Sequence, residues 1–116
     1  MWSYEFYSDD YGYEPVREFI LSLDEKRRGK VLQMIQMLSE FGPNLPFPYS
    51  SQIEGKLREM RVHHGKSQLR IIYYLKSEGV FMLLHAFEKK SQKISGNDIR
   101  IARERMQNDL KKEVHK

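Results

Sequence analysis

Apolar and polar residues alternate along the second half of the chain at the spacing of β-strands. Between residues 53 and 93 the apolar residues form short runs rich in Val, Ile, Tyr and Phe, which is typical of strands. Residues 63–66 and 77–79 separate these runs, and each segment contains a glycine that suits a tight turn. The pattern predicts three consecutive strands in an antiparallel meander.

The same alternation predicts which side chains share a face of the sheet. In residues 69–76 it puts Leu69 and Tyr73 on one face and Arg70 on the other. Residues 80–87 have two apolar faces, and we therefore expect this strand inside the sheet. One face carries Val80, Met82, Leu84 and Ala86, and the other carries Phe81, Leu83, His85 and Phe87.

The first half of the chain is predicted to be largely helical. Residues 2–7 alternate as a half-buried strand, and residues 15–23 then follow the spacing of a short amphipathic helix. Asp24 is a good N-cap for a second helix, which the Gly-Pro pair at residues 42–43 ends. Two further prolines favour an ordered loop over residues 44–51.

A final helix is expected from Ser95, the N-cap, with Asp98 in the capping position three residues later. Three arginines lie off its apolar stripe and are expected to face water: Arg100, Arg103 and Arg105. The predicted order is β-α-α-β-β-β-α. We expect an α+β fold, in which an N-terminal helical hairpin covers one face of a small, mostly antiparallel sheet and a helix ends the chain. At 116 residues, we expect a single domain over residues 1–116.

The composition excludes several classes of site. The chain has no cysteine, which excludes disulfides, thiolate chemistry and zinc–thiolate sites. It has no phosphate-binding glycine loop and no HExxH motif, and its four histidines are poorly placed for a three-ligand metal site, so no metal or cofactor is predicted. No apolar run approaches the roughly 18–20 residues of a membrane span, and the N-terminal residues do not resemble a signal peptide, so we expect a cytoplasmic protein.

Positive charge is concentrated in the predicted meander. Residues 55–93 hold nine Lys or Arg against three acids, whereas the whole chain has a net charge of +4. Arg61 and Arg70 flank the same turn, and antiparallel pairing brings His85, Lys89 and Lys90 toward them. Lys93 could join this group. Such a cluster suits phosphate, because Arg binds it bidentately and Lys acts as a point charge.

If the phosphate belongs to RNA, cleavage without a metal is chemically accessible. The 2′-OH attacks the adjacent phosphorus, with help from a base, cations and an acid. His85 matches proton transfer near neutral pH, Glu59 could act as the base or orient an Arg, and Arg70 and Lys90 could stabilise the transition state.

Structural roles for the same residues stay open. Glu59 could form a cross-strand ion pair, His85 could be a hydrogen-bonded structural histidine, and the Lys89-Lys90 pair could lie in a solvated turn. Four aromatic residues could stack on bases or fill the core: Tyr73, Tyr74, Phe81 and Phe87.

Four segments resemble the RelE/ParE superfamily of toxins, most closely its phage-derived HigB-like branch: LREMR (57–61), LRIIYY (69–74), LLHAFEKKSQK (83–93) and IxxARER (99–105). The resemblance implies a RelE-like fold and a toxin of a type II toxin–antitoxin system. Its partner would be a cognate antitoxin, often a helix-turn-helix protein of the HigA kind, and a heterotetramer of two toxins and two antitoxins is expected. The implied activity is that of a metal-independent endoribonuclease that cuts mRNA on the 70S ribosome.

The resemblance also assigns roles to individual residues. Arg70 matches the strand arginine that contacts the scissile phosphate, and Arg61 falls near the basic residues before that strand. Lys89 and Lys90 match a Lys/Arg cluster, and His85 matches a histidine common in the HigB-like branch. We expect further RNA contacts from Lys66, Lys93, His63 and His64.

The chain departs from RelE in one catalytic position. RelE has a catalytic tyrosine near its C-terminus, whereas this chain has no tyrosine after Tyr74. The role is vacant or passes to His85 or a lysine. The ParE branch shares the fold but inhibits gyrase without cutting RNA. A gyrase-binding toxin and an inactive phage-derived interaction module are therefore the alternatives.

Overall fold

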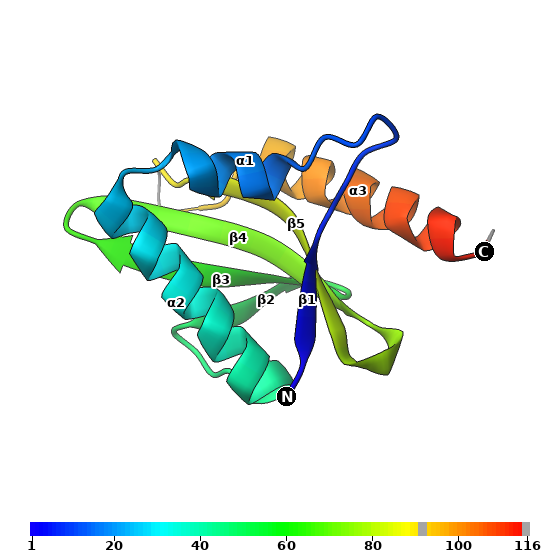
Figure 1. Cartoon of the computed structure of the whole chain (residues 1–116), viewed down its shortest axis with the longest axis horizontal. Coiled ribbons are helices and arrows are strands. Elements are labelled where there is room, and N and C mark those ends of the chain that lie inside the picture. The colour runs from blue at the N-terminus through cyan, green and yellow to red at the C-terminus, as the bar shows by residue number, and fades with distance from the viewer. Residues whose placement is uncertain (91–92, 115–116) are drawn as a thin grey trace.

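The computed structural model describes residues 1–90 and 93–114, which form one five-stranded sheet with helices on both faces (Figure 1). The strands are β1 (Ser3–Phe6), β2 (Ser50–Glu54), β3 (Leu57–His64), β4 (Ser67–Lys76) and β5 (Val80–Glu88). The helices are α1 (Pro15–Ser22), α2 (Glu25–Phe41) and α3 (Gly96–Val114), with short 3-10 turns at η1 (Gly42–Asn44) and η2 (Ser77–Gly79). The predicted α+β class is confirmed.

The strands lie in the order β1-β5-β4-β3-β2. β1 runs parallel to β5, and every other neighbouring pair is antiparallel. The prediction that the strand after residue 79 lies inside the sheet is confirmed, because β5 has β1 on one side and β4 on the other.

The meander has one strand more than the sequence predicted. Residues 50–54 form β2, although residues 50–51 were expected in a loop and residues 53–62 in a single strand. Gly55 has φ +50° and reverses the chain, and Gln52 Nε2 donates to its carbonyl oxygen at 2.9 Å. Gly55 was not recognised as a turn because a lone glycine, without an adjacent Asn, Asp, Pro or second Gly, is a weak turn signal.

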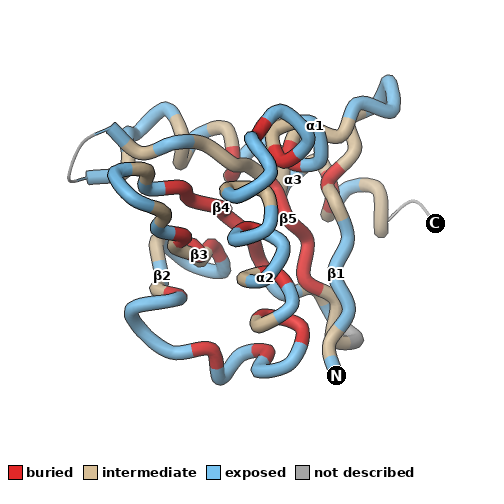
Figure 2. The backbone as a smooth tube through the Cα atoms, turned by 60° about the vertical axis from the view of Figure 1, so that its left-hand side comes forward, coloured by how far each residue is buried: buried red, intermediate tan, exposed pale blue. Residues whose placement is uncertain are grey.

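The two sheet faces are covered by different helices. On one face α1 and α2 bury Val16, Ile35 and Leu38 against strand residues that include Met60 and Leu83. On the other face Ala102, Met106 and Leu110 of α3 pack against a second group, including Ile72 and Leu84. Figure 2 shows that the buried positions follow β4 and β5, whereas β1 at the edge is largely exposed.

A β-bulge changes the faces predicted for β5. Ile72 pairs with His85 and Tyr73 pairs with Leu83, so Leu84 has no partner of its own on β4. The alternation is shifted by one residue at this point. The prediction that His85 and Phe87 share a face with Leu83 is therefore wrong, because both lie on the α3 face.

Local signals at the helix ends are confirmed. Asp24 Oδ1 accepts a hydrogen bond from the backbone N–H of Arg27 at 2.9 Å, and Gly42, with φ +58°, ends α2. Ser95 Oγ accepts from the backbone N–H of Asp98 at 3.1 Å at the start of α3. Among the helices in the described ranges, none combines the length and apolar character that crossing a membrane requires.

Candidate functional site

Three neighbouring strands place charged side chains on the sheet face where α3 packs. Glu59 and Arg61 are two residues apart in β3 and therefore share a face. Arg61 pairs directly with Arg70 of β4, and Arg70 pairs with Phe87 of β5. Strand pairing thus puts two arginines side by side, next to one carboxylate.

Glu59 is the shared partner of what we call the arginine cluster, defined as Glu59, Arg61, Arg70 and Lys89. Arg61 Nε donates to Glu59 Oε1 at 2.8 Å, and Arg70 Nε lies 3.7 Å from the same oxygen. Ser51 Oγ on β2 donates to that oxygen at 3.4 Å and accepts from Arg61 Nη2 at 3.2 Å. One carboxylate oxygen therefore holds both guanidinium groups in place.

The centre of the arginine cluster is buried but not fully satisfied. Glu59 and Arg70 are each 3% exposed. Within the described part of the chain, Glu59 Oε2 and Arg70 Nε are buried without a hydrogen-bond partner. Leaving a buried polar atom unsatisfied costs about 1–3 kcal/mol, and such atoms are rare in folded proteins. Atoms of this kind make the arginine cluster a candidate site for binding a ligand.

Arg70 is held from several sides. Its Nη1 donates to the carbonyl oxygen of Leu69 at 3.1 Å, and its Nη2 donates to Gln68 Oε1 at 3.4 Å. Burial lowers the pKa of Arg70; Glu59 opposes this effect and Arg61 adds to it. The side chain remains a cation, because a guanidinium group is a very weak acid, and its charge is poorly screened by water.

Lys89 brings a third cation to the arginine cluster. Its backbone N–H donates to the carbonyl oxygen of Gln68 at 2.7 Å. The pKa of the Lys89 ammonium is lowered by burial and then by Arg70, with Glu59 opposing. Lys89 and Lys90 also line a hollow of about 210 Å³ at the start of α3. The cluster thus has three cations around one carboxylate.

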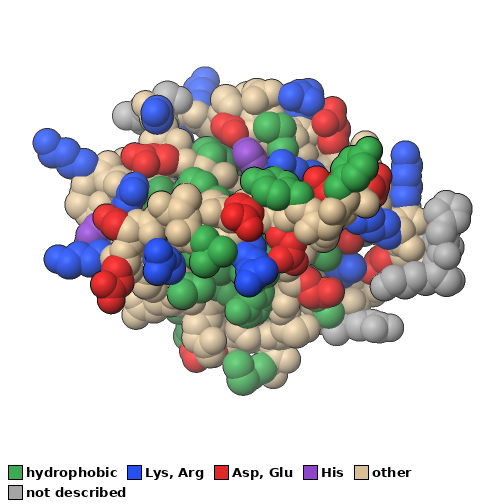
Figure 3. All heavy atoms as spheres, turned by 45° about the horizontal axis from the view of Figure 1, so that its top comes forward, with side chains coloured by type: hydrophobic (Ala, Val, Ile, Leu, Met, Phe, Trp, Pro, Cys, Tyr) green, Lys and Arg blue, Asp and Glu red, His purple; other side chains and the backbone are tan. Residues whose placement is uncertain are grey.

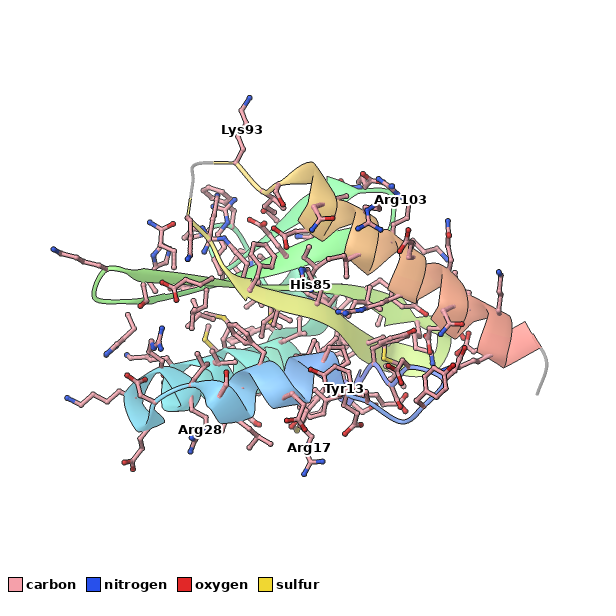
Figure 4. All side chains as sticks on the ribbon, turned by 90° about the horizontal axis from the view of Figure 1, so that it is seen from above. Tyr13, Arg17, Arg28, His85, Lys93 and Arg103 are labelled. Atoms are coloured by element: carbon pink, nitrogen blue, oxygen red, sulfur yellow. The ribbon has the colours of Figure 1, made fainter. Side chains whose placement is uncertain are left out.

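His85 lies in β5, four residues before Lys89, and both of its ring nitrogens have a partner. Its Nε2 lies 2.7 Å from Asp98 Oδ1, and Arg105 Nη1 lies 3.3 Å from its Nδ1. Arg105 can only donate, so Nδ1 accepts and the Nε2–H donates to Asp98. Burial lowers the pKa of His85; Asp98 opposes this effect and Arg105 adds to it. Phe87 stacks on the ring with centroids 5.1 Å apart. His85 therefore joins β5 to α3 (Figure 4).

The remaining predicted RNA contacts lie at the margins. His63 and His64 end β3 and Lys66 lies in the turn to β4, at the tip of the hairpin. Figure 3 shows Lys, Arg and His side chains at the left-hand end of the molecule, where Figure 1 shows this hairpin. Lys93 lines the hollow at the start of α3, and its side chain points outward (Figure 4). In the described ranges, no group of three or more His, Asp or Glu is placed to hold a metal ion.

Most of the aromatic residues considered for base stacking belong to the core. Tyr73, Tyr74 and Phe81 are buried, and only Phe87 is partly exposed. Tyr73 shares a hydrogen bond with Ser50 Oγ at 2.6 Å, and the Tyr74 hydroxyl donates to Asp109. These rings are not available to a base.

Several residues at the site were not predicted from the sequence. Ser51 was assigned to a loop, and Arg105 was expected in water although it donates to the carbonyl oxygen of Leu84 at 2.9 Å. Phe47 was passed over, although its ring centroid lies 5.0 Å from Arg61 Cζ. A phenylalanine between two prolines, in the ordered loop predicted for residues 44–51, was the available signal.

Sequence comparison identifies one family. The phage-derived Gp49-like protein family (DUF891) matches residues 18–107. The matched region runs from α1 into α3 and contains the whole arginine cluster and His85. No curated protein matches the chain at a significant level.

Proposed function

The chain belongs to the phage-derived Gp49-like family, and from this premise we propose that it is the toxin of a type II toxin–antitoxin system, an endoribonuclease that cuts mRNA on the ribosome. Its α+β architecture is compatible with a small RelE-like fold. The observation that carries the proposal is the arginine cluster, in which cations outnumber the single carboxylate and buried polar atoms lack partners.

Arg70 binds the scissile phosphate in this proposal. Its guanidinium is fixed by Glu59, Gln68 and the backbone of β4, so little ordering is lost when the phosphate arrives. Arg61 and Lys89 add charge where the phosphorane becomes more negative. Such preorganised charge in a poorly hydrated site is the main source of transition-state stabilisation.

Proton transfer is assigned to Glu59 and Lys89. The unpaired Oε2 of Glu59 accepts the proton of the 2′-OH as its oxygen attacks the phosphorus. The bond from phosphorus to the 5′-oxygen breaks, and the leaving oxygen takes a proton from the Lys89 ammonium. The lowered pKa of Lys89 makes it a better acid than an ordinary lysine. The products are a 2′,3′-cyclic phosphate and a free 5′-hydroxyl.

His85 has a positioning role in this proposal. Its two ring nitrogens are occupied by Asp98 and Arg105, which leaves none for the 2′-OH. By fixing the start of α3 it keeps Lys89 and Lys90 near the arginine cluster. This replaces the sequence-based hypothesis that His85 transfers the proton.

We also propose that a cognate antitoxin of the helix-turn-helix HigA kind neutralises the toxin in the cytoplasm by covering the arginine cluster. The excess of positive charge there suits an acidic surface on the antitoxin. A heterotetramer of two toxins and two antitoxins is the assembly that we expect.

Primer extension on a translated mRNA, with and without ribosomes, tests the proposed activity. Arg70→Ala should lower the rate of ribosome-dependent cutting by about 100-fold or more, because it removes the phosphate ligand. Glu59→Gln keeps the size of the side chain and should slow cutting through loss of the base. Arg100→Ala, at an exposed arginine of α3, is the matched control and should cut normally.

Circular dichroism establishes that each variant is folded. Undiminished cutting by a folded Arg70→Ala protein would remove Arg70 from the mechanism. Growth arrest with intact mRNA would instead support the alternative of a ParE-like toxin, and a gyrase supercoiling assay would then identify the target.

A further inference from the structure

An exposed aromatic loop stands beside the arginine cluster. Phe47 is 70% exposed and Tyr49 is 43% exposed, in the segment 46–49 between η1 and β2. The backbone N–H of Tyr49 donates to the carbonyl oxygen of Pro46 at 2.9 Å, and the Tyr49 carbonyl accepts from the N–H of Arg61 at 2.9 Å. The loop is thus fixed to β3, so its rings are presented at little entropic cost.

Arg61 joins this loop to the arginine cluster. Its Cζ lies 5.0 Å from the centroid of the Phe47 ring, and its Nε and Nη2 are bound to Glu59 and Ser51. A guanidinium against an aromatic face gives a cation–π contact. The ring is therefore held in a defined place next to the cations, although most of its surface stays in water.

A groove continues from the loop along the edge of the sheet. It has a volume of about 330 Å³, its apolar lining includes Met34, Met37 and Val62, and Lys30 and Arg61 add positive charge. None of the described residues that line it is acidic. The size and the few polar groups suit one flat, apolar ligand such as a nucleobase.

We propose that Phe47 and this groove bind bases of single-stranded RNA next to the phosphate held by Arg70. Aromatic faces stack on any base, while neighbouring cations follow the backbone phosphates. The position of the scissile phosphate rests on the proposed function, but base binding by Phe47 does not require cleavage. Phe47 thus contributes to the affinity for the RNA strand, and Arg70 binds its phosphate.

RNA explains the surface better than an apolar peptide segment does. A peptide would gain little from an exposed ring that is backed by a guanidinium, whereas a base gains stacking on its whole face. The groove lies on the α2 side of β3, and Arg61, which also lines it, belongs to the arginine cluster on the α3 side, so the two surfaces adjoin at this strand.

Binding of a short single-stranded RNA that carries 2-aminopurine tests this inference, because stacking quenches the fluorescence of 2-aminopurine. The unsubstituted protein should quench it, and Phe47→Ala should raise the Kd roughly tenfold. Phe47→Tyr keeps an aromatic face and should bind normally. Tyr11→Ala removes a ring that is 97% exposed in the loop between β1 and α1, and is the matched control.

Equal affinities of Phe47→Ala and the unsubstituted protein would overturn the inference, as would an absence of quenching. Displacement of the RNA by an acidic peptide, together with an equal loss of peptide binding in Phe47→Ala and in Phe47→Tyr, would assign the surface to a protein partner instead. Loss of quenching in Phe47→Ala, in a protein that never cuts mRNA, would keep the RNA surface and reject the nuclease proposal.

Discussion

Single contacts distinguish two residues that the sequence could not tell apart. Glu59 and His85 were both candidates for proton transfer, and both lie on the α3 face of the sheet. Glu59 has a buried oxygen without a partner in the described structure, whereas both nitrogens of His85 are bonded to neighbours. The proposed role of Glu59 as the base therefore rests on an acceptor atom that has no partner, and the positioning role of His85 on nitrogens that are already bonded.

The partly buried position of His85 predicts a dependence of stability on pH. Its pKa in the folded protein is lowered from 6.5, chiefly by burial, so the unfolded chain binds more protons just below pH 6.5. The stabilisation is present above pH 6.5 and is lost as pH falls through the lowered value. Urea unfolding between pH 7.5 and 5 should show this loss, and His85→Gln should flatten that part of the profile.

The control for this prediction is His63→Gln, at an exposed histidine on the hairpin. Its pH profile should follow that of the unsubstituted protein. A His85→Gln profile with the original slope would show that other groups cause the pH dependence.

Single elements are positioned by short irregularities. The bulge at Leu84 turns His85 toward α3, and Arg105 of α3 donates to the carbonyl oxygen of the bulged residue. The left-handed conformation of Gly55 reverses the chain so that β2 can pair with β3. Ser51 of β2 then contacts Glu59 in the arginine cluster. The site therefore depends on the places where regular alternation fails.

Two glycines, one inside α2 and one that ends it, give opposite predictions for the free energy of unfolding. Gly42 has φ +58°, and a Cβ there would collide with the ring of Trp2, so Gly42→Ala should destabilise the protein by more than about 1 kcal/mol. Gly29 lies inside α2 with open space around it, so Gly29→Ala should stabilise by about 0.5–1 kcal/mol. Urea unfolding measures the free energy of unfolding of both variants. Equal changes in the two variants would contradict the predicted collision with Trp2.

In the folded molecule, the positive charges of the meander fall into two groups that differ in how far they are neutralised. Lys76 lies 2.9 Å from Glu113 and 3.4 Å from Asp109 of α3, so its charge is neutralised within the structure. At the other part of the same face, Arg61 and Arg70 share the single carboxylate of Glu59, and Arg70 contributes to the lowered pKa of Lys89. The sequence count of charge therefore overstates what is available to an anionic partner.

Salt dependence of RNA binding follows from this distribution. Each cation that contacts a phosphate contributes about −0.7 to the slope of log affinity against log salt for single strands. Lys90→Ala should reduce the magnitude of the slope by about that amount in fluorescence titrations. Lys111→Ala, near the C-terminal end of α3, is the control and should leave the slope unchanged. An unchanged slope in Lys90→Ala would place Lys90 outside the RNA path.

The sequence by itself determined the class of fold and the identity of the central cations. The helix limits at Asp24 and Gly42 and the strands around Arg70 follow from local rules, because caps, glycine turns and alternation act over a few residues. Antiparallel pairing across a short turn was enough to place Arg61 beside Arg70.

Only the tertiary structure decided which groups are available for chemistry. The bulge at Leu84 left no trace in a strand that is apolar on both faces, so the face of His85 was mispredicted. The contacts of Glu59 with Ser51 and of Arg61 with Phe47 join segments far enough apart that periodicity carries no information about them. Burial and hydrogen-bond satisfaction are properties of packing, and they distinguish the roles that we propose for the residues of this candidate site.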